Sequence, residues 1–166
     1  MRIRTRCWKG ATSVNLYDEL TALIDALNAA RAGYALCGGL AVALHGHPRA
    51  TQDVDLLVPE AHLEDIKAAL APLGFTVPAL PMTFDPGTAS ERRVHRISKV
   101  AGDETLTVDL VLVGSAFGRA WETRESLDWR GRRLVAVSRE GLAQMKRLAG
   151  RAQDLADLDA LELAHE

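Results

Sequence analysis

Two aspartates separated by one residue, Asp53 and Asp55, stand at the start of a run that ends at Val58. Residues two apart on a β-strand point to the same face, so these carboxylates project side by side. Adjacent negative charges repel unless a cation lies between them, and carboxylate oxygens suit Mg²⁺ or Mn²⁺. A pair of such ions about 4 Å apart is the usual clamp for in-line displacement at phosphorus. The spacing therefore predicts a divalent-metal site for phosphoryl chemistry.

A third aspartate, Asp109, stands inside the apolar segment 105–113, between Val108 and Leu110. This composition predicts a central strand, where a lone ionised carboxylate is costly unless a cation or dense hydrogen bonding compensates it. A metal shared with Asp53 and Asp55 would supply that compensation. We therefore expect the three carboxylates to converge.

A glycine pair, Gly38 and Gly39, separates the apolar segment 34–37 from a predicted helix. Glycine lets the backbone approach a ligand closely, and a helix N-terminus points free N–H groups at an anion. The pair therefore either holds the phosphates of a nucleotide or simply permits a tight turn, and the two interpretations are compatible.

Four polar residues have both a functional and a structural interpretation. Arg49 and Thr51 either contact phosphate or base, or hold the turn that precedes the Asp53 strand. Lys146 either neutralises nucleotide charge or is a solvated helix residue. Arg151 either binds phosphate or pairs with Asp154, which would then be the N-cap of the last helix.

Hydrophobic periodicity predicts helices and strands that alternate along the chain. The predicted helices are 15–30, 40–44, 61–73, 138–149 and a last one with a stripe of Leu155, Leu158 and Leu161. The predicted strands are 34–37, 53–58, 74–77, 94–97, 105–113 and a hairpin of 127–130 with 133–137. Residues 78–90 are predicted as a loop in which 82–84 pair briefly. We expect an α/β or α+β fold: a mixed sheet of four to six strands flanked by helices.

The 166 residues predict one domain, 1–166, with a basic N-terminal arm over 1–14 and C-terminal helices over 138–166 packed on the core. The 48% apolar and 25% charged fractions are those of soluble domains, which argues against disorder. Neither a secretory signal nor a membrane span is indicated, so we expect a cytoplasmic protein without a membrane partner. The two cysteines, Cys7 and Cys37, are poor material for a disulfide framework, and we expect Cys37 to be a buried free thiol.

The order of these motifs resembles a known superfamily. Gly38-Gly39, thirteen residues, and then Asp53-Val-Asp55-Leu-Leu-Val resemble the signature of polymerase-beta-like nucleotidyltransferases. Within them, Gly-Gly-Leu-Ala-Val-Ala-Leu-His-Gly followed by Arg49-Ala-Thr51-Gln-Asp53-Val-Asp55 is most similar to the AbiEii-type toxin nucleotidyltransferases and their small relatives. Lys146 with Arg151, Asp154 and Asp157 is similar to the pattern that closes the domain in those proteins.

The resemblance implies a nucleotidyltransferase fold with C-terminal helices. Asp53, Asp55 and Asp109 would be the catalytic metal ligands, and Asp109 would lie nearest the attacking hydroxyl. Gly38, Gly39, Arg49, Thr51, Lys146 and Arg151 would bind the nucleotide or its phosphates. The implied reaction transfers a nucleoside monophosphate from an NTP to a hydroxyl of RNA, protein or a small molecule, with Mg²⁺ or Mn²⁺ as cofactor. It also implies a toxin–antitoxin setting with a cognate antitoxin as partner.

Two other classes of function compete with the enzyme. One is a catalytically inactive nucleotidyltransferase-fold protein that acts as a binding or antitoxin-like module, against which the intact Asp53, Asp55 and Asp109 argue. The other is a nucleic-acid-binding adaptor that uses the arginine-rich stretch 130–151, although this stretch is equally well an ordinary solvated surface.

Overall fold

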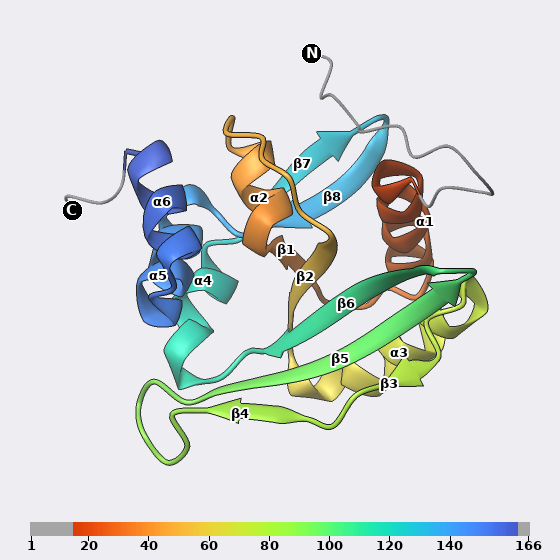
Figure 1. Cartoon of the computed structure of the whole chain (residues 1–166), viewed down its shortest axis with the longest axis horizontal. Helices are drawn as coiled ribbons and strands as arrows, with labels where there is room; N and C mark the ends of the chain where they lie inside the picture. Colours follow the sequence, from red (N-terminus) through yellow and green to blue (C-terminus); the bar gives the residue numbers. More distant parts are fainter. Residues whose placement is uncertain (1–14, 163–166) are drawn as a thin grey trace.

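The computed structural model describes residues 15–162, so the predicted basic arm, Cys7 and residues 163–166 lie outside the described residues. The described chain forms an open mixed sheet flanked by helices, which confirms the predicted fold class (Figure 1). The strands are β1 (Ala35–Cys37), β2 (Asp53–Val58), β3 (Val77–Pro78), β4 (Met82–Phe84), β5 (Arg92–Ala101), β6 (Glu104–Leu112), β7 (Glu125–Trp129) and β8 (Arg132–Ala136). The helices are α1 (Leu16–Ala29), α2 (Gly38–Leu44), α3 (Leu63–Leu70), α4 (Gly118–Glu122), α5 (Arg139–Ala149) and α6 (Ala152–Ala160).

The strands follow the order β3-β5-β6-β2-β1-β8-β7, and β4 pairs with β5 beside β3. β2 runs parallel to β6, whereas β1 is antiparallel to β2 and parallel to β8. β6 therefore has a partner on each side, which confirms the predicted central position of the strand that carries Asp109. The sheet has eight strands rather than four to six, because the short strands β3 and β4 both pair with β5.

Local capping explains where two of the predicted helices begin and end. Asn15 accepts a hydrogen bond from the Tyr17 backbone N–H at 3.0 Å and begins α1. Ser138 likewise accepts from the Gly141 N–H at 3.1 Å at the start of α5, which ends at Gly150 with a φ of 62°. A side-chain oxygen satisfies an N–H that the first turn leaves free, and glycine tolerates the left-handed terminal conformation.

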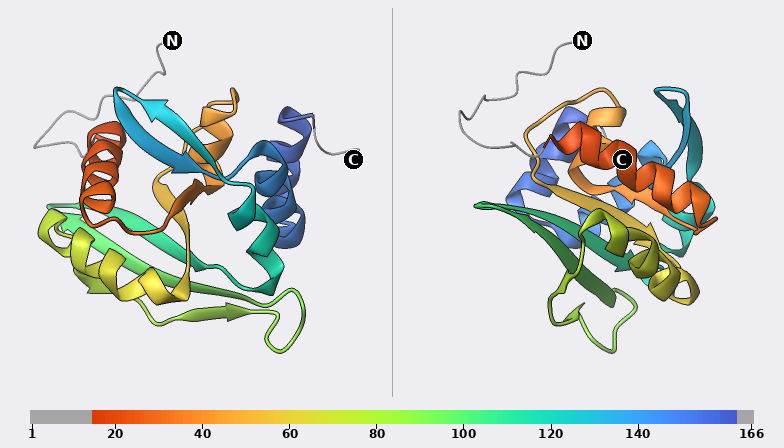
Figure 2. Two further views of the ribbon diagram at one scale, coloured as in Figure 1. Left: turned by 180° about the vertical axis from the view of Figure 1, so that it is seen from behind. Right: turned by 90° about the vertical axis from the view of Figure 1, so that its right-hand side faces the viewer.

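The helices gather in two groups. α1 and α3 pack together at one side of the molecule, whereas α4, α5 and α6 lie together at the other (Figure 1). The views from behind and from the side agree with this division (Figure 2). Within residues 15–162 no helix has the length and apolar character needed to cross a membrane.

Several predicted elements need correction. β5 begins at Arg92 and ends at Ala101, well beyond the predicted 94–97, and β3, Val77–Pro78, shares only Val77 with the predicted 74–77. Residues 82–84 form a true strand, and α4 was not predicted. In α6, Leu158 and Leu161 are buried as predicted, but Leu155 is 54% exposed, so its place in the buried stripe was wrong.

Candidate active site

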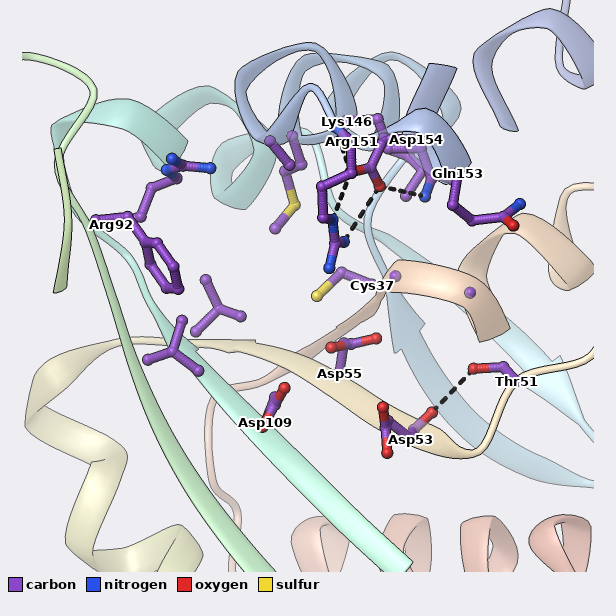
Figure 3. Close-up of a pocket in the computed structure, with 18 of the residues that line it drawn as sticks. Cys37, Thr51, Asp53, Asp55, Arg92, Asp109, Lys146, Arg151, Gln153 and Asp154 are labelled. Carbon is purple, nitrogen blue, oxygen red and sulfur yellow. Dashed lines mark hydrogen bonds and ion pairs between the residues drawn. The ribbon is translucent and has the colours of Figure 1, made fainter. Parts of the chain in front are cut away.

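The three aspartates border one cavity of about 650 Å³. Asp53 and Asp55 stand two residues apart on β2, and the parallel register pairs Asp55 with Asp109 on β6. Figure 3 shows the three labelled side chains below Arg151 and Asp154 of the C-terminal helices. The structure thus brings together carboxylates from two separate stretches of the sequence.

Burial and mutual repulsion act on the central carboxylate of this group. Burial is the largest cause that raises the pKa of Asp55, followed by the negative charges of Asp109 and Asp53, so that the pKa reaches about 6. Arg151 and Lys146 offset only part of this effect. A positive charge near Asp55 would therefore be stabilised by the surrounding carboxylates.

Arg96 on β5 already supplies one such charge to Asp109. Its Nε donates to Asp109 Oδ1 at 2.7 Å and its Nη2 donates to Oδ2 at 2.8 Å, and this pairing raises the pKa of Arg96. The sequence interpretation missed Arg96, but a signal existed. Counting outward from a two-residue turn at Gly102 and Asp103 pairs Arg96 with Asp109, as observed.

The donor chemistry of the site fits a hard divalent ion, since carboxylate oxygens are what Mg²⁺ and Mn²⁺ prefer. Within the described part of the chain, however, no three His, Cys, Asp or Glu side chains are already arranged to hold a metal ion. Both oxygens of Asp109 are engaged by Arg96. We therefore expect metal binding by all three aspartates to compete with the pair of Arg96 and Asp109.

The glycine pair packs directly against the acidic residues and the loop before β2. Gly38 has a φ of 62°, and a Cβ at this position would lie 1.9 Å from Asp55 Oδ2. A Cβ at Gly39 would lie 2.9 Å from Thr51 Oγ1 and 3.1 Å from Arg49 Nη2. These contacts support the tight-turn interpretation, and both glycines also border the cavity, where the phosphates are predicted to bind.

Three of the predicted phosphate-binding residues belong to a buried charge network. Arg49 donates to Asp157 at 2.7 and 3.0 Å, Lys146 to Asp154 and Asp157 at 3.3 and 2.5 Å, and Arg151 to Asp154 at 2.7 Å. Lys146 is only 3% exposed, so the interpretation as a solvated helix residue was wrong. The N-cap of α6 is Arg151, and Asp154 accepts its backbone N–H from the third helical position, which corrects the predicted cap.

Thr51 and Arg151 differ in how their side chains are held. Thr51 donates a long hydrogen bond of 3.4 Å to the backbone oxygen of Asp53, which supports its structural role beside β2. The Arg151 side chain pairs with Asp154, but it is 77% exposed and borders the cavity, so it is accessible to an anion bound there.

Another part of the cavity wall was not assigned to the site from the sequence: Met82 and Phe84 lie in the segment predicted as a loop, and Arg92 lies before the predicted strand 94–97. Met82 and Phe84 of β4 and Arg92 and Val94 of β5 border the cavity beyond Asp109. The guanidinium of Arg92 lies over the Phe84 ring, 5.3 Å from its centroid. Alternation along β5 carries Arg92, Val94 and Arg96 to the same face.

Comparison with known proteins agrees with this geometry. A mixed sheet that presents carboxylates from adjacent strands beside a glycine turn defines the class of nucleotidyltransferases. Residues 19–163 match the family model described as aminoglycoside-2''-adenylyltransferase, so the chain belongs to that family. Comparison with curated protein sequences found no match.

Solved structures share the fold at low sequence identity. A candidate nucleotidyltransferase from Thermotoga maritima is 15% identical, with 86% of this chain and 89% of that chain covered and a TM-score of 0.57. ANT(2'')-Ia in complex with adenylyl-2''-tobramycin is 16% identical, with 89% and 86% covered and a TM-score of 0.57. A nucleotidyltransferase-like antigen of Paracoccidioides brasiliensis is 19% identical, with 90% and 74% covered and a TM-score of 0.53. The closer resemblance to AbiEii-type toxins stays a prediction.

Proposed function

We propose that this nucleotidyltransferase moves a nucleoside monophosphate from an NTP to an acceptor hydroxyl in a reaction that depends on Mg²⁺ or Mn²⁺. The observation that carries the proposal is the register that sets Asp55 beside Asp109, with Asp53 on the same cavity. The raised pKa of Asp55 supports it, because crowded carboxylates favour a bound cation.

Each aspartate has its own part in the proposal. Asp53, Asp55 and Asp109 would hold the metal, and Asp109 would also receive the proton of the acceptor hydroxyl. The acceptor oxygen then bonds to the α-phosphorus, the bond from that phosphorus to the bridging oxygen breaks, and pyrophosphate leaves. Bound Mg²⁺ or Mn²⁺ would supply neutralisation of the phosphate charge.

The glycine turn and the nearby cations would position the triphosphate. Gly38 and Gly39 leave room for a close approach to the backbone, and the exposed Arg151 would pair with a phosphate oxygen. Arg49 and Lys146 would act mainly by holding the charge network in place, since their nitrogens already donate to buried carboxylates. Catalysis would be chiefly a matter of orientation and charge compensation.

The second candidate function is a catalytically inactive nucleotidyltransferase-fold module that binds a partner, as an antitoxin-like protein would. The bidentate pair of Arg96 with Asp109 favours it, because a guanidinium satisfies the carboxylate without a metal. The two candidate functions differ in one property. In the enzyme, Asp109 would leave Arg96 and contact the metal and the acceptor, whereas in the inactive module Asp109 would stay paired with Arg96.

The acceptor of the proposed reaction is a molecule that carries a free hydroxyl. An RNA end, a protein side chain and a small molecule all offer hydroxyls, and the family name adds aminoglycosides to the acceptors worth testing. A cytoplasmic location, expected because the sequence indicates no secretory signal, and pairing with a cognate antitoxin, implied by the AbiEii-type resemblance, belong to the same proposal.

The test measures transfer of label from each α-³²P-labelled NTP, supplied one at a time with Mg²⁺ or Mn²⁺ and cell extract. The wild type is compared with Asp53→Ala and Asp109→Asn, and Asp65→Asn serves as the matched control because Asp65 is an exposed residue of α3. We expect label transfer by the wild type and the control, and none by the two site variants. Equal labelling by all four proteins, or none by any of them, would count against the enzyme.

A further inference from the structure

We infer that the acceptor carries an anionic group, a phosphate or a carboxylate, next to its reactive hydroxyl. This inference rests on the proposed function and deepens it, because it names the chemistry of the second substrate. It also separates the acceptor of this chain from the polycationic sugars that give the family its name.

The acceptor must bind on the side of the cavity where Asp109 receives its proton. From Asp109 the cavity wall continues over β5 and β4, through Val94 and Phe84 to Arg92. Figure 3 shows Arg92 at the end of the cavity opposite Thr51, which lies beside the glycine turn proposed for the phosphates. An acceptor that enters from the Arg92 end reaches Asp109 without crossing the nucleotide.

The charges on the cavity wall do not suit a polycation. The described residues that border the cavity include five cationic side chains, Arg49, Arg92, Arg96, Lys146 and Arg151, and four carboxylates, Asp53, Asp55, Asp109 and Asp154. The first three carboxylates are proposed metal ligands, and Asp154 already pairs with Lys146 and Arg151. Among these described residues no carboxylate is left for the ammonium groups of an aminoglycoside. Such a ligand would instead face arginines, and like charges across an interface disfavour binding.

Arg92 has the properties of an anion-binding residue. Its side chain is 16% exposed, and its Nε is buried without a hydrogen-bond partner in the described part of the chain. Its ion pair, from Nη2 to Asp85 at 2.5 Å, leads to a carboxylate that is 52% exposed and therefore screened by water. The guanidinium lies over the Phe84 ring, which also borders the cavity, and this cation–π contact helps to hold Arg92 beside the cavity.

Arg96 adds a second cation on the same face of β5, four residues closer to the β5–β6 turn. When Asp109 exchanges Arg96 for the metal, the 40% exposed side chain of Arg96 becomes free to pair with an anion beside the reacting hydroxyl. Both arginines can bind a phosphate or a carboxylate through two parallel N–H groups. Val94 lies between the two arginines on β5 and Phe84 lies beside Arg92 on β4, and these apolar side chains would accommodate the uncharged body of the acceptor.

Isothermal titration calorimetry on the whole chain tests this inference. The protein is first saturated with Mn²⁺ and α,β-methylene ATP, so that the phosphate subsite is filled and transfer is blocked. Ribose 5-phosphate, gluconate, ribose and tobramycin are then titrated as phosphate, carboxylate, neutral and polycationic probes. The variants are Arg92→Gln and Arg92→Lys. Arg93→Gln is the matched control, because Arg93 faces the other side of β5 and pairs with Glu60.

We expect at least one anionic probe to bind more tightly than ribose and tobramycin, and the tighter of the two identifies the anionic group. Arg92→Gln should weaken that binding at least about 10-fold, and Arg92→Lys should weaken it less, because lysine keeps the charge but loses the paired N–H groups. Arg93→Gln should stay close to the wild type. Tighter binding of tobramycin, or an Arg92→Gln variant that binds the anion normally, overturns the inference. So does failure of both anions to bind when the Mn²⁺–nucleotide complex forms, and in that case the proposed function still stands. If the Mn²⁺–nucleotide complex itself does not form, the proposed function fails and the inference fails with it.

Discussion

Replacing Lys146 with methionine removes the cation that contacts both buried aspartates of α6. The Lys146 Nζ donates to Asp157 at 2.5 Å and to Asp154 at 3.3 Å, and all three residues are at most 3% exposed. Methionine fills a similar volume without a charge. The two carboxylates then keep Arg49 and Arg151 as cationic partners, which are 28% and 77% exposed.

The size of the effect follows from the burial of the pair. Removing one partner of a buried ion pair costs about 3–5 kcal/mol, because the other charge stays buried without compensation. Arg49 and Arg151 keep part of that compensation, so we expect Lys146→Met to lower the free energy of unfolding by about 3 kcal/mol. Against the roughly 5–15 kcal/mol typical of a domain, that loss is large but leaves a folded protein.

Urea denaturation followed by circular dichroism measures this loss, and its pH dependence identifies the cause. Burial alone would raise the pKa of Asp157, but hydrogen bonds from Arg49, Lys146 and Gln153 lower it overall. Burial likewise would raise the pKa of Asp154, and its interactions with Arg151 and Lys146 lower it overall. A depressed folded-state pKa contributes stability above the unfolded value, and this contribution is lost as the pH falls through the folded value. The difference between wild type and Lys146→Met should therefore be full at about pH 7 and shrink below about pH 4.

Lys67→Met is the matched control, since Lys67 makes an exposed pair with Glu64 on α3, and we expect a loss below about 1 kcal/mol. A Lys146→Met variant as stable as this control would refute the reasoning. A large loss that does not change between neutral and acidic pH would also refute it, because the cause would then be packing rather than charge.

Three further predictions concern the cavity itself. Gly38→Ala should reduce label transfer at least about 100-fold, because the new methyl group displaces the Asp55 carboxylate. In metal-free protein, Asp55→Asn should stabilise the fold, because the folded state disfavours the ionised form of Asp55. The gain should reach up to about 3 kcal/mol at a pH above the raised pKa of about 6, and it should vanish at a pH below the pKa of the unfolded chain. Arg96→Gln should tighten Mn²⁺ binding about 10-fold in the absence of nucleotide, because Asp109 then has no competing partner.

Each of these predictions has a control and a contrary outcome. Gly46→Ala shares the positive φ, but its Cβ meets nothing within 4 Å, so it should lose stability and keep activity; equal activity losses would contradict the Asp55 explanation. For Asp55→Asn, urea denaturation with EDTA should find almost no gain at about pH 3, below the unfolded pKa, and a full gain there would contradict the electrostatic cause. For Arg96→Gln, calorimetry that finds unchanged Mn²⁺ affinity would rule out competition for Asp109.

The sequence predicted those elements whose signals are local. β2 has the predicted bounds. α5 begins after Ser138 and ends before Gly150, because these two residues next to the helix form its caps. The convergence of Asp53, Asp55 and Asp109 was also predictable, because one apolar strand carries the pair and another carries the third. Their roles as metal ligands stay predictions.

Long-range partners explain what the sequence did not reveal. β5 is polar on both faces, with Arg92, Arg93 and Arg96 among its first residues, so periodicity indicated only its apolar middle; pairing with β6 extends it. In α6 the buried face carries Asp154 and Asp157 instead of Leu155, because cations from α5 and from the loop before β2 satisfy the two carboxylates. Arg49 and Asp157 are 108 positions apart, and no local pattern joins them.

The hairpin of β5 and β6 gathers Arg92, Arg96 and Asp109 onto one continuous stretch of chain, whereas the glycine turn and Asp53–Asp55 come from an earlier stretch. One short segment thus carries the residues proposed to face the acceptor, and another carries those proposed to face the nucleotide. Exchange of this hairpin between related chains that keep the aspartate at position 109 would change the proposed acceptor contacts, while Gly38, Gly39, Asp53 and Asp55 stay unchanged. In evolutionary terms, the proposed acceptor specificity can change through this one segment of the chain.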